Sequence, residues 1–290
     1  MEINRSGFYK WQARRAASLS GAPPSQLEIK RAEARILFAK YHELYPSHGY
    51  RWLNAKIKLD YPDKNYSDQF AHRVCKYLGI KSTAKKIKRY GKSKARKEMK
   101  QFPNLLLKEL QPNAPLEIVV SDMTAFYVGP WYYELTLFMD LFNNEIIGYY
   151  LTNTRGNPEA YHLALKGVLK RKATEKELEM ILHTDQGSVY ASRKFNEKLP
   201  LYGIVHSMSK PGTPTENGAM EAINGWVKEE LFTDFWQLKM KAGEDVDKVI
   251  ADYIYYFNYE RPAYALGYLT PIQYKQKYYE KCKNCLLRVD

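Results

Sequence analysis

The chain has 290 residues, of which 45% are hydrophobic, and its formal net charge is +13. A chain of this size can bury a core in one large or several small domains, and the positive charge favours an anionic partner. The sequence contains no run of eighteen apolar residues and no apolar segment of the signal-peptide type, so neither a membrane-spanning helix nor secretion is expected. The odd count of three cysteines is typical of a reducing compartment, and we expect a cytoplasmic protein.

The first part of the chain predicts a short leader and a small helical module. Residues 1–26 contain a proline-rich break near their end, and residues 27–80 contain three apolar patterns with a helical period. The first predicted helix runs from Leu27 to Leu44, the second carries Trp52 and Ile57, and the third begins at the N-cap Ser67 and ends at Gly79. The side chains expected in the core of this module include Ala34, Leu37, Tyr41, Leu44, Leu53, Phe70, Val74, Tyr77 and Leu78.

Basic residues distinguish the outside of this module and the segment after it. Arg51 and Arg73 are expected on the surface of a helix-turn-helix-like unit, which can place one helix in a DNA groove. A protein-protein element with a basic surface is the other open interpretation. Residues 81–112 form a basic linker, in which ten Lys or Arg stand against one acid between Lys81 and Lys100. A solvated linker often has this composition, but beside a helical module we favour phosphate contacts, made by Lys85, Lys86, Lys88 and Arg89.

Residues 113–235 predict a mixed sheet covered by helices. Three extended segments joined by turns at Gly129-Pro130 and Asn143-Asn144 indicate an antiparallel meander. The pattern then alternates between helices and strands and ends in a helix from Glu216 to Phe232. Residues 236–290 predict a helical extension, with one helix from Glu244 to Tyr259. The strands are expected at Ile118–Phe126, Tyr132–Asp140, Glu145–Leu151, Met180–Leu182 and Gly203–His206, and the intervening helices at Pro158–Arg171 and near Lys194.

Three acids occupy unusual places in this pattern. Asp122 interrupts a buried strand, where an ionised carboxylate is costly unless a cation compensates it. Asp185 follows the apolar run that ends at Leu182, and Gly187 then lets the backbone turn away. Taken singly, such acids are more often structural than catalytic. Glu221 lies on the last predicted helix, where Asn224 and Lys228 share its side, while Ala219, Ile223, Trp226 and Glu230 share another side.

The residues around these acids carry a resemblance. The sequences Ser121-Asp122-Met123-Thr124, His183-Thr184-Asp185-Gln186-Gly187-Ser188-Val189-Tyr190 and Glu216-Asn217-Gly218-Ala219-Met220-Glu221 together resemble the DDE transposases of the insertion-sequence-three family and, more distantly, the catalytic core of retroviral integrases. The thirty-five residues from 186 to 220 match the spacing of that family's second and third acids. Further similar sequences occur at residues 4–11, 48–51, 256–262 and 266–271. The chain departs from the family at Val120, where tryptophan is common, and at Glu216, where aspartate is common; spacing favours Glu221 as the third acid, and Glu216 suits a helix start.

The resemblance implies an RNase H-like fold and a transposase that cleaves DNA strands and transfers them at the ends of an insertion sequence. It implies that Asp122, Asp185 and Glu221 bind Mg²⁺, for which Mn²⁺ substitutes, as a pair of ions. Because Asn224 and Lys228 share the predicted helix face of Glu221, we expect these two residues to contact DNA. His183 either orients this site or packs in the core. The implied partners are double-stranded DNA, further copies of the chain on that DNA, and an upstream-frame partner or fusion with a helix-turn-helix, which places the protein at the bacterial nucleoid. The alternatives are a catalytically silent DNA-binding regulator and a metal-dependent nuclease of the same fold.

Overall fold

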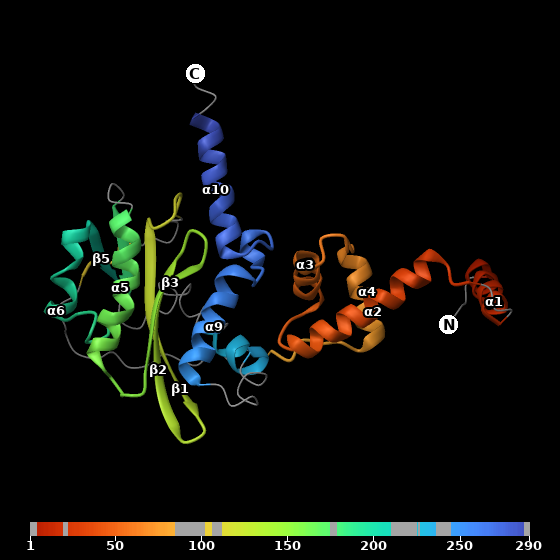
Figure 1. The fold of residues 1–290 in the computed structure, drawn as a ribbon, viewed down its shortest axis with the longest axis horizontal. Coiled ribbons are helices and arrows are strands. Elements are labelled where there is room, and N and C mark those ends of the chain that lie inside the picture. Colours follow the sequence, from red (N-terminus) through yellow and green to blue (C-terminus); the bar gives the residue numbers. More distant parts are fainter. Residues whose placement is uncertain are drawn as a thin grey trace. The chain divides into compact units, whose positions relative to one another are not determined.

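A computed structural model of the chain describes residues 5–19, 23–84, 102–105, 112–174, 179–209, 225, 227–235 and 245–286. The chain divides into two compact units, residues 1–83 and 84–290 (Figure 1). The finer boundaries at residues 26, 112 and 235 stay predictions. Among the helices that the structure describes, none has the length and apolar character that a membrane span requires.

All regular secondary structure in the described part of the first unit is helical. It contains α1 (Arg5–Leu19), α2 (Gln26–Leu44), α3 (Tyr50–Asp60) and α4 (Asp68–Leu78). The predicted ends of α4 are confirmed: the Ser67 side chain accepts a hydrogen bond from the Phe70 amide at 3.3 Å, and Gly79 ends the helix with a φ of 70°. A side chain other than glycine is strained at that φ.

The core of this unit differs from the prediction most clearly at Tyr77, and Leu37, Leu44, Phe70 and Leu78 are only half-buried. Tyr77 was expected inside but is 68% exposed, and its ring lies 3.8 Å from the guanidinium carbon of Arg35. Phe38, rather than the half-buried Leu37, is fully buried on α2. The helical period allows either residue, because Leu37 and Phe38 both stand three or four residues from Ala34 and Tyr41. Packing against the rest of the unit selects Phe38, whose ring lies 6.1 Å from that of Tyr66.

The second unit is built on a five-stranded sheet in the order β3-β2-β1-β4-β5. Strands β1 (Ile118–Val128), β2 (Trp131–Asp140) and β3 (Glu145–Thr152) pair antiparallel, whereas β4 (Met180–Thr184) and β5 (Ile204–Met208) continue the sheet parallel to β1. This order confirms the predicted meander and the mixed sheet. The predicted turns are present, since Gly129 and Asn144 have φ values of 56° and 57°.

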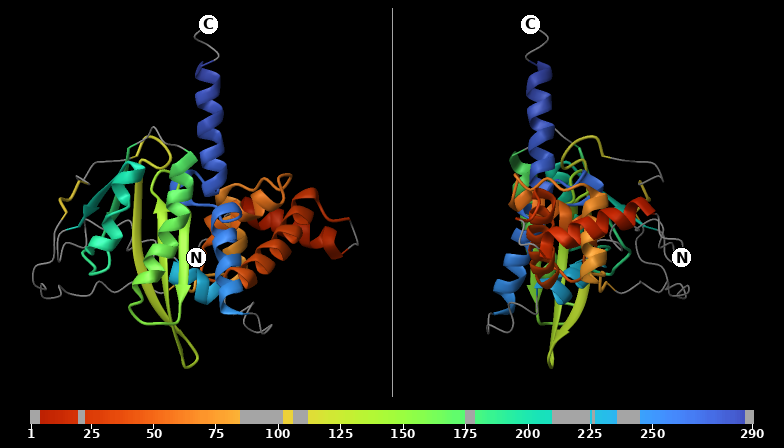
Figure 2. Two further views of the ribbon diagram at one scale, coloured as in Figure 1. Left: turned by 60° about the vertical axis from the view of Figure 1, so that its left-hand side comes forward. Right: turned by 90° about the vertical axis from the view of Figure 1, so that its right-hand side faces the viewer.

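Helices cover both faces of this sheet. Figure 1 shows α5 (Pro158–Thr174) on one face and α9 (Val246–Tyr259) on the other. On the α5 face, Val119 and Leu182 of the sheet join Ala164 and Val168 of the helix in the main apolar core. The chain also contains α6 (Arg193–Asn196), η1 (Leu199–Tyr202), the π-helix η3 (Leu231–Phe235), η4 (Tyr264–Leu266) and α10 (Pro271–Leu286), which extends beyond the end of the sheet (Figure 2).

A buried carboxylate attaches α10 and α5 to the edge strand β3. Glu145 is almost fully buried, and its Oε1 accepts a hydrogen bond from Arg171 Nη2 of α5 at 2.7 Å. Lys275 of α10 forms a second ion pair with the same carboxylate. A buried charge with two cationic partners is compensated, so these contacts fix the packing of both helices on the sheet.

Candidate active site

The strand register brings two of the predicted acids together. Ser121 of β1 pairs with Thr184 of β4 in the parallel ladder, and the next residue on each chain is a carboxylate, Asp122 and Asp185. Paired positions on adjacent strands direct their side chains to the same face of a sheet. Asp122 therefore lies on β1 beside Asp185, which directly follows the last residue of β4, and both carboxylates are half-buried.

Short backbone hydrogen bonds orient each of these carboxylates. Asp185 Oδ1 accepts a hydrogen bond from the Gly187 amide at 2.9 Å, and Asp122 Oδ1 accepts one from the Met123 amide at 2.8 Å. A Cβ atom at Gly187 would lie 2.9 Å from Asp185 Oδ1. Glycine at this position therefore leaves space for the carboxylate and lets the backbone turn under it.

The environment of Asp185 disfavours its charged form. Burial raises the pKa of Asp185, and the hydrogen bond from the Gly187 amide only partly offsets that effect. The pKa of Tyr161 on α5 is raised to about 12 by burial and then by the carboxylates of Glu134, Asp185 and Asp122. The negative potential of both acids thus reaches one tyrosine. A cation between the two carboxylates would relieve this potential, because opposite charge favours the ionised form.

A buried tyrosine supports the strand that carries Asp122. The hydroxyl of Tyr190 lies 2.7 Å from Ser121 Oγ, and Ser121 Oγ in turn donates to the Leu137 carbonyl at 2.9 Å. Because serine has one hydroxyl proton, Tyr190 must donate and Ser121 accept. The Tyr190 ring also packs edge-on against Tyr161 at 5.0 Å.

We predict that Tyr190→Phe lowers the free energy of unfolding by about 1 kcal/mol, because one buried hydrogen bond is lost while the ring remains. Urea denaturation followed by circular dichroism measures this change. The variant should keep the cleavage activity that the sequence resemblance implies, since the Tyr190 hydroxyl bonds to Ser121 of β1 and to neither carboxylate. A loss of cleavage at full stability would contradict this supporting role.

His183 lies in the core rather than at the edge of the site. It is fully buried on β4, and its Nδ1 lies 2.9 Å from Ser207 Oγ on β5. Ser207 Oγ also accepts a hydrogen bond from the Leu105 amide at 2.9 Å. These contacts support the packing interpretation of His183, which ties β4 to β5.

The structure describes only some of the remaining predicted site residues. Lys228 is exposed on the helical turn at residues 227–230, and Arg51 and Arg73 are exposed on the first unit, where Arg51 Nε lies 3.7 Å from Asp68 Oδ2. Within the described part of the chain no group of three or more metal-binding side chains occurs. The residues that lie outside the described ranges are Glu221, Asn224, Lys85, Lys86, Lys88 and Arg89, and their roles stay predictions.

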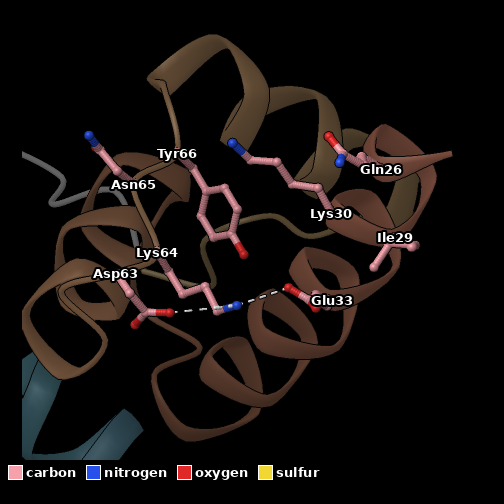
Figure 3. Close-up of a pocket in the computed structure, with 8 residues that line it drawn as sticks. All are labelled: Gln26, Ile29, Lys30, Glu33, Asp63, Lys64, Asn65 and Tyr66. Atoms are coloured by element: carbon pink, nitrogen blue, oxygen red, sulfur yellow. Dashed lines mark hydrogen bonds and ion pairs between the residues drawn. The ribbon is translucent and has the colours of Figure 1, made fainter.

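A separate open pocket of about 440 Å³ lies in the first unit, between α2 and the segment before α4 (Figure 3). Lys64 crosses it, with its Nζ 2.9 Å from Glu33 and 3.7 Å from Asp63. Lys30 lies 5.6 Å from the centre of the Tyr66 ring. Because two lysines and two acids line it, this pocket has no excess positive charge for phosphate binding.

Two family models match the second unit, and a solved structure is similar to it. A family model described as "Integrase core domain" matches residues 112–214, and a second model with the same description matches residues 202–271. The HTLV-2 integrase catalytic core domain, solved in complex with magnesium, is 18% identical, with a TM-score of 0.45, and the match covers 57% of this chain and 99% of that one.

Full-length relatives are insertion-sequence proteins. The protein assigned as transposase InsK of element IS150 in Escherichia coli K12 is 30% identical over 279 residues, which cover 96% of this chain and 92% of the relative. The protein assigned as transposase of IS986/IS6110 in Mycobacterium tuberculosis H37Rv is 26% identical, with 88% and 91% covered. Together with the RNase H-like sheet and the paired carboxylates, these matches show that the chain belongs to the insertion-sequence-three family of DDE transposases, the polynucleotidyl transferases of DNA transposition.

Proposed function

We propose that Asp122, Asp185 and Glu221 form the active site in which this chain cleaves DNA strands and transfers them at the ends of an insertion sequence. The observation that carries the proposal is the pairing of Ser121 with Thr184, which sets two half-buried carboxylates side by side on one face of the sheet. Glu221 would join them from the helix predicted at Glu216–Phe232, of which the structure describes residues 227–230 as helical.

The residues present fit a hard divalent cation. Their donors are carboxylate oxygens, which Mg²⁺ prefers, and the burial that raises the pKa of Asp185 leaves a negative site that a cation would neutralise. When bound, a pair of Mg²⁺ ions, or Mn²⁺ in their place, would activate the attacking oxygen and stabilise the leaving oxygen of a phosphodiester. Asp122 and Asp185 hold fixed positions for this purpose through the sheet, and Lys228, with Asn224, contacts the DNA phosphates beside them.

The helical unit supplies a second contact with double-stranded DNA. On α4 the exposed residues Gln69, Arg73 and Lys76 follow one another at spacings of four and three, so that they share one face. Arg51 lies in the first turn of α3. A polar, basic helix face of this kind suits a DNA groove. The basic linker residues Lys85, Lys86, Lys88 and Arg89 add phosphate contacts.

We predict that Arg73→Ala weakens binding to duplex DNA and reduces the slope of log affinity against log salt by about 1, because one phosphate contact is lost. Fluorescence anisotropy across a salt series measures this slope. Lys64→Met is the matched control, since the Lys64 ammonium is engaged by Glu33 and Asp63. Equal slopes for Arg73→Ala and wild type would remove Arg73 from the DNA interface.

The proposal includes partners. Two element ends must be joined in one reaction, so several copies of the chain assemble on the ends and the target, at the nucleoid. An upstream-frame partner or fusion supplies a further helix-turn-helix.

The test of this function is an assay of supercoiled plasmid and element-end oligonucleotides with Mn²⁺ and then Mg²⁺. A transposase both nicks the DNA and joins the oligonucleotide to the plasmid. Nicking without joining would favour the nuclease, and binding without either reaction would favour the silent regulator.

A further inference from the structure

Three buried polar residues outside the proposed active site have no role in the chemistry described so far. Glu230, Asn258 and Arg261 are 4%, 7% and 8% exposed, respectively. Asn258 and Arg261 belong to the C-terminal sequence Tyr256–Pro262. Burying a charged or amide side chain costs free energy unless the side chain is paired. The partners of these three residues therefore indicate the role of the C-terminal sequence.

Arg261 and Glu230 form a two-point ion pair. Arg261 Nε donates to Glu230 Oε2 at 2.5 Å, and Arg261 Nη2 donates to Glu230 Oε1. The planar guanidinium fork thereby fixes both the distance and the orientation of the carboxylate, which a lysine cannot do. The guanidinium also lies 5.0 Å from the centre of the Phe257 ring. Arg261 is therefore itself held in one place.

Glu230 lies directly before η3, the helical segment that contacts the sheet. Residues 227–230 are helical and continue into η3. Phe232 of η3 packs edge-on against Phe126 of β1 at 5.1 Å. Phe126 lies four residues after Asp122, and alternation along the strand puts both side chains on the same face. This helix end thus contacts the strand that carries the first acid.

The other side of the ion pair is anchored to the sheet edge through α9. Asn258 Oδ1 accepts a hydrogen bond from the Ile146 amide at 2.9 Å, and Asn258 Nδ2 donates to the Ile146 carbonyl at 2.9 Å. Ile146 belongs to β3, the edge strand. Asn258 replaces the partner that a neighbouring strand would supply, and it fixes the end of α9 from which Arg261 follows three residues later.

We propose that Arg261 and Glu230, with Asn258 as their anchor, are positioning residues that set the helical segment 227–235 against the sheet. They would thereby hold the preceding chain, in which Glu221 is the predicted third acid, where its carboxylate meets Asp122 and Asp185. The proposal rests on the proposed assignment of Glu221, which precedes Glu230 by nine residues. The continuous chain of contacts runs from β3 through Asn258, Arg261 and Glu230 to the helix. It explains why charged and amide residues stand in the C-terminal sequence at positions where apolar ones would also fill the space.

The alternative is that this ion pair stabilises the fold without any bearing on the site. Buried ion pairs are weak contributors to stability relative to apolar replacements, whereas a two-point pair between a guanidinium and a carboxylate adds geometric specificity. A neighbouring buried pair supplies the control. Lys275 and Glu145 also attach a C-terminal helix to β3, but their hydrogen bonds and ion pairs in the described structure involve no residue of 227–235.

The test compares Arg261→Lys with Lys275→Met in the full-length protein. Mn²⁺ binding is measured by titration calorimetry, and the melting temperature is measured on the same samples without metal. Arg261→Lys keeps the charge but loses the fork, and we expect about tenfold weaker Mn²⁺ binding, as is typical when a residue that orients a metal ligand is changed. Lys275→Met should keep Mn²⁺ binding within about twofold of wild type at a similar loss of melting temperature.

Equal Mn²⁺ affinity for Arg261→Lys and wild type would overturn the proposal. If Arg261→Lys does not fold, the double variant Glu230→Leu with Arg261→Met, which buries no charge, takes its place with the same expected weakening. Glu221→Gln is titrated alongside. If Glu221→Gln binds Mn²⁺ like wild type, the assignment of the third acid fails, and the positioning role falls with it; if Glu221→Gln loses Mn²⁺ while the Arg261 variant does not, only the positioning role fails.

Discussion

Replacing Glu221 with glutamine is expected to reduce metal-dependent DNA cleavage by about a thousandfold or more, since metal ions held by the three proposed carboxylates would supply several kcal/mol of transition-state stabilisation. The fold should be unchanged, because glutamine has nearly the same shape as glutamate. Plasmid nicking in Mn²⁺ and Mg²⁺, with circular dichroism of both proteins, measures this difference. Retained metal-dependent cleavage in the variant would reject Glu221 as the third acid, and Glu216→Gln is the matched control from the same segment.

Asp185→Asn tests the same site at a residue that the structure places next to Asp122. The effect of this change on stability should depend on pH. Burial raises the pKa of Asp185 above its value in the unfolded chain, so the folded state binds this proton more tightly. The stability that this group contributes is therefore present at pH values below the unfolded pKa of about 3.9 and is lost as the pH rises through the raised pKa. At pH 7 without metal, Asp185→Asn should melt at the same temperature as wild type or higher, while its cleavage is lost. A lower melting temperature would indicate a structural rather than a metal-binding carboxylate.

Gly167→Ala is expected to destabilise the protein by about 3 kcal/mol, against the usual gain when alanine replaces glycine in a helix. A Cβ atom at Gly167 would lie 2.6 Å from the Ile147 carbonyl oxygen and 2.9 Å from Gly148 Cα. Both are backbone atoms of β3, so neither can move aside as a side chain could. The clash must move α5 away from the sheet. Urea denaturation measures the resulting loss in the free energy of unfolding.

Lys166→Ala on the same helix is the matched control for Gly167→Ala. Lys166 is exposed, so its replacement should change the free energy of unfolding by less than about 0.5 kcal/mol. If Gly167→Ala were as stable as Lys166→Ala, the close approach of α5 to β3 would be wrong. Tyr161 on α5 would then not lie beside the two carboxylates as described.

Local signals in the sequence predicted much of the fold. The N-cap Ser67, Gly79 and the turns at Gly129 and Asn144 were predicted, because each depends on the chemistry of one or two residues. Tyr77 was predicted wrongly, because an aromatic side chain at helical spacing fits a core and an exposed cation contact equally well. The exposed position of Tyr77 depends on its contact with Arg35 of α2. Arg35 is too far from Tyr77 in the sequence for a local pattern to reveal this contact.

The sequence predicted the strand positions of two proposed site carboxylates, but it did not predict the residues that support them. The sequence placed Asp122 and Asp185 at strand positions, and the register then set them beside each other. The contact between Tyr190 and Ser121 was missed, since 69 residues separate them. The pair of Glu230 and Arg261 was also missed, although one signal was present: Glu230 stands on the apolar side of its predicted helix, and an acid there requires a buried cation.

The proposed active site is tested most directly by locating Mn²⁺ through anomalous diffraction from crystals of the full-length protein grown with Mn²⁺. We expect a peak in contact with carboxylate oxygens of Asp122, Asp185 and Glu221 at about 2.0–2.2 Å. A peak bound by Glu216 instead of Glu221, or Mn²⁺ bound away from Asp122 and Asp185, would contradict it.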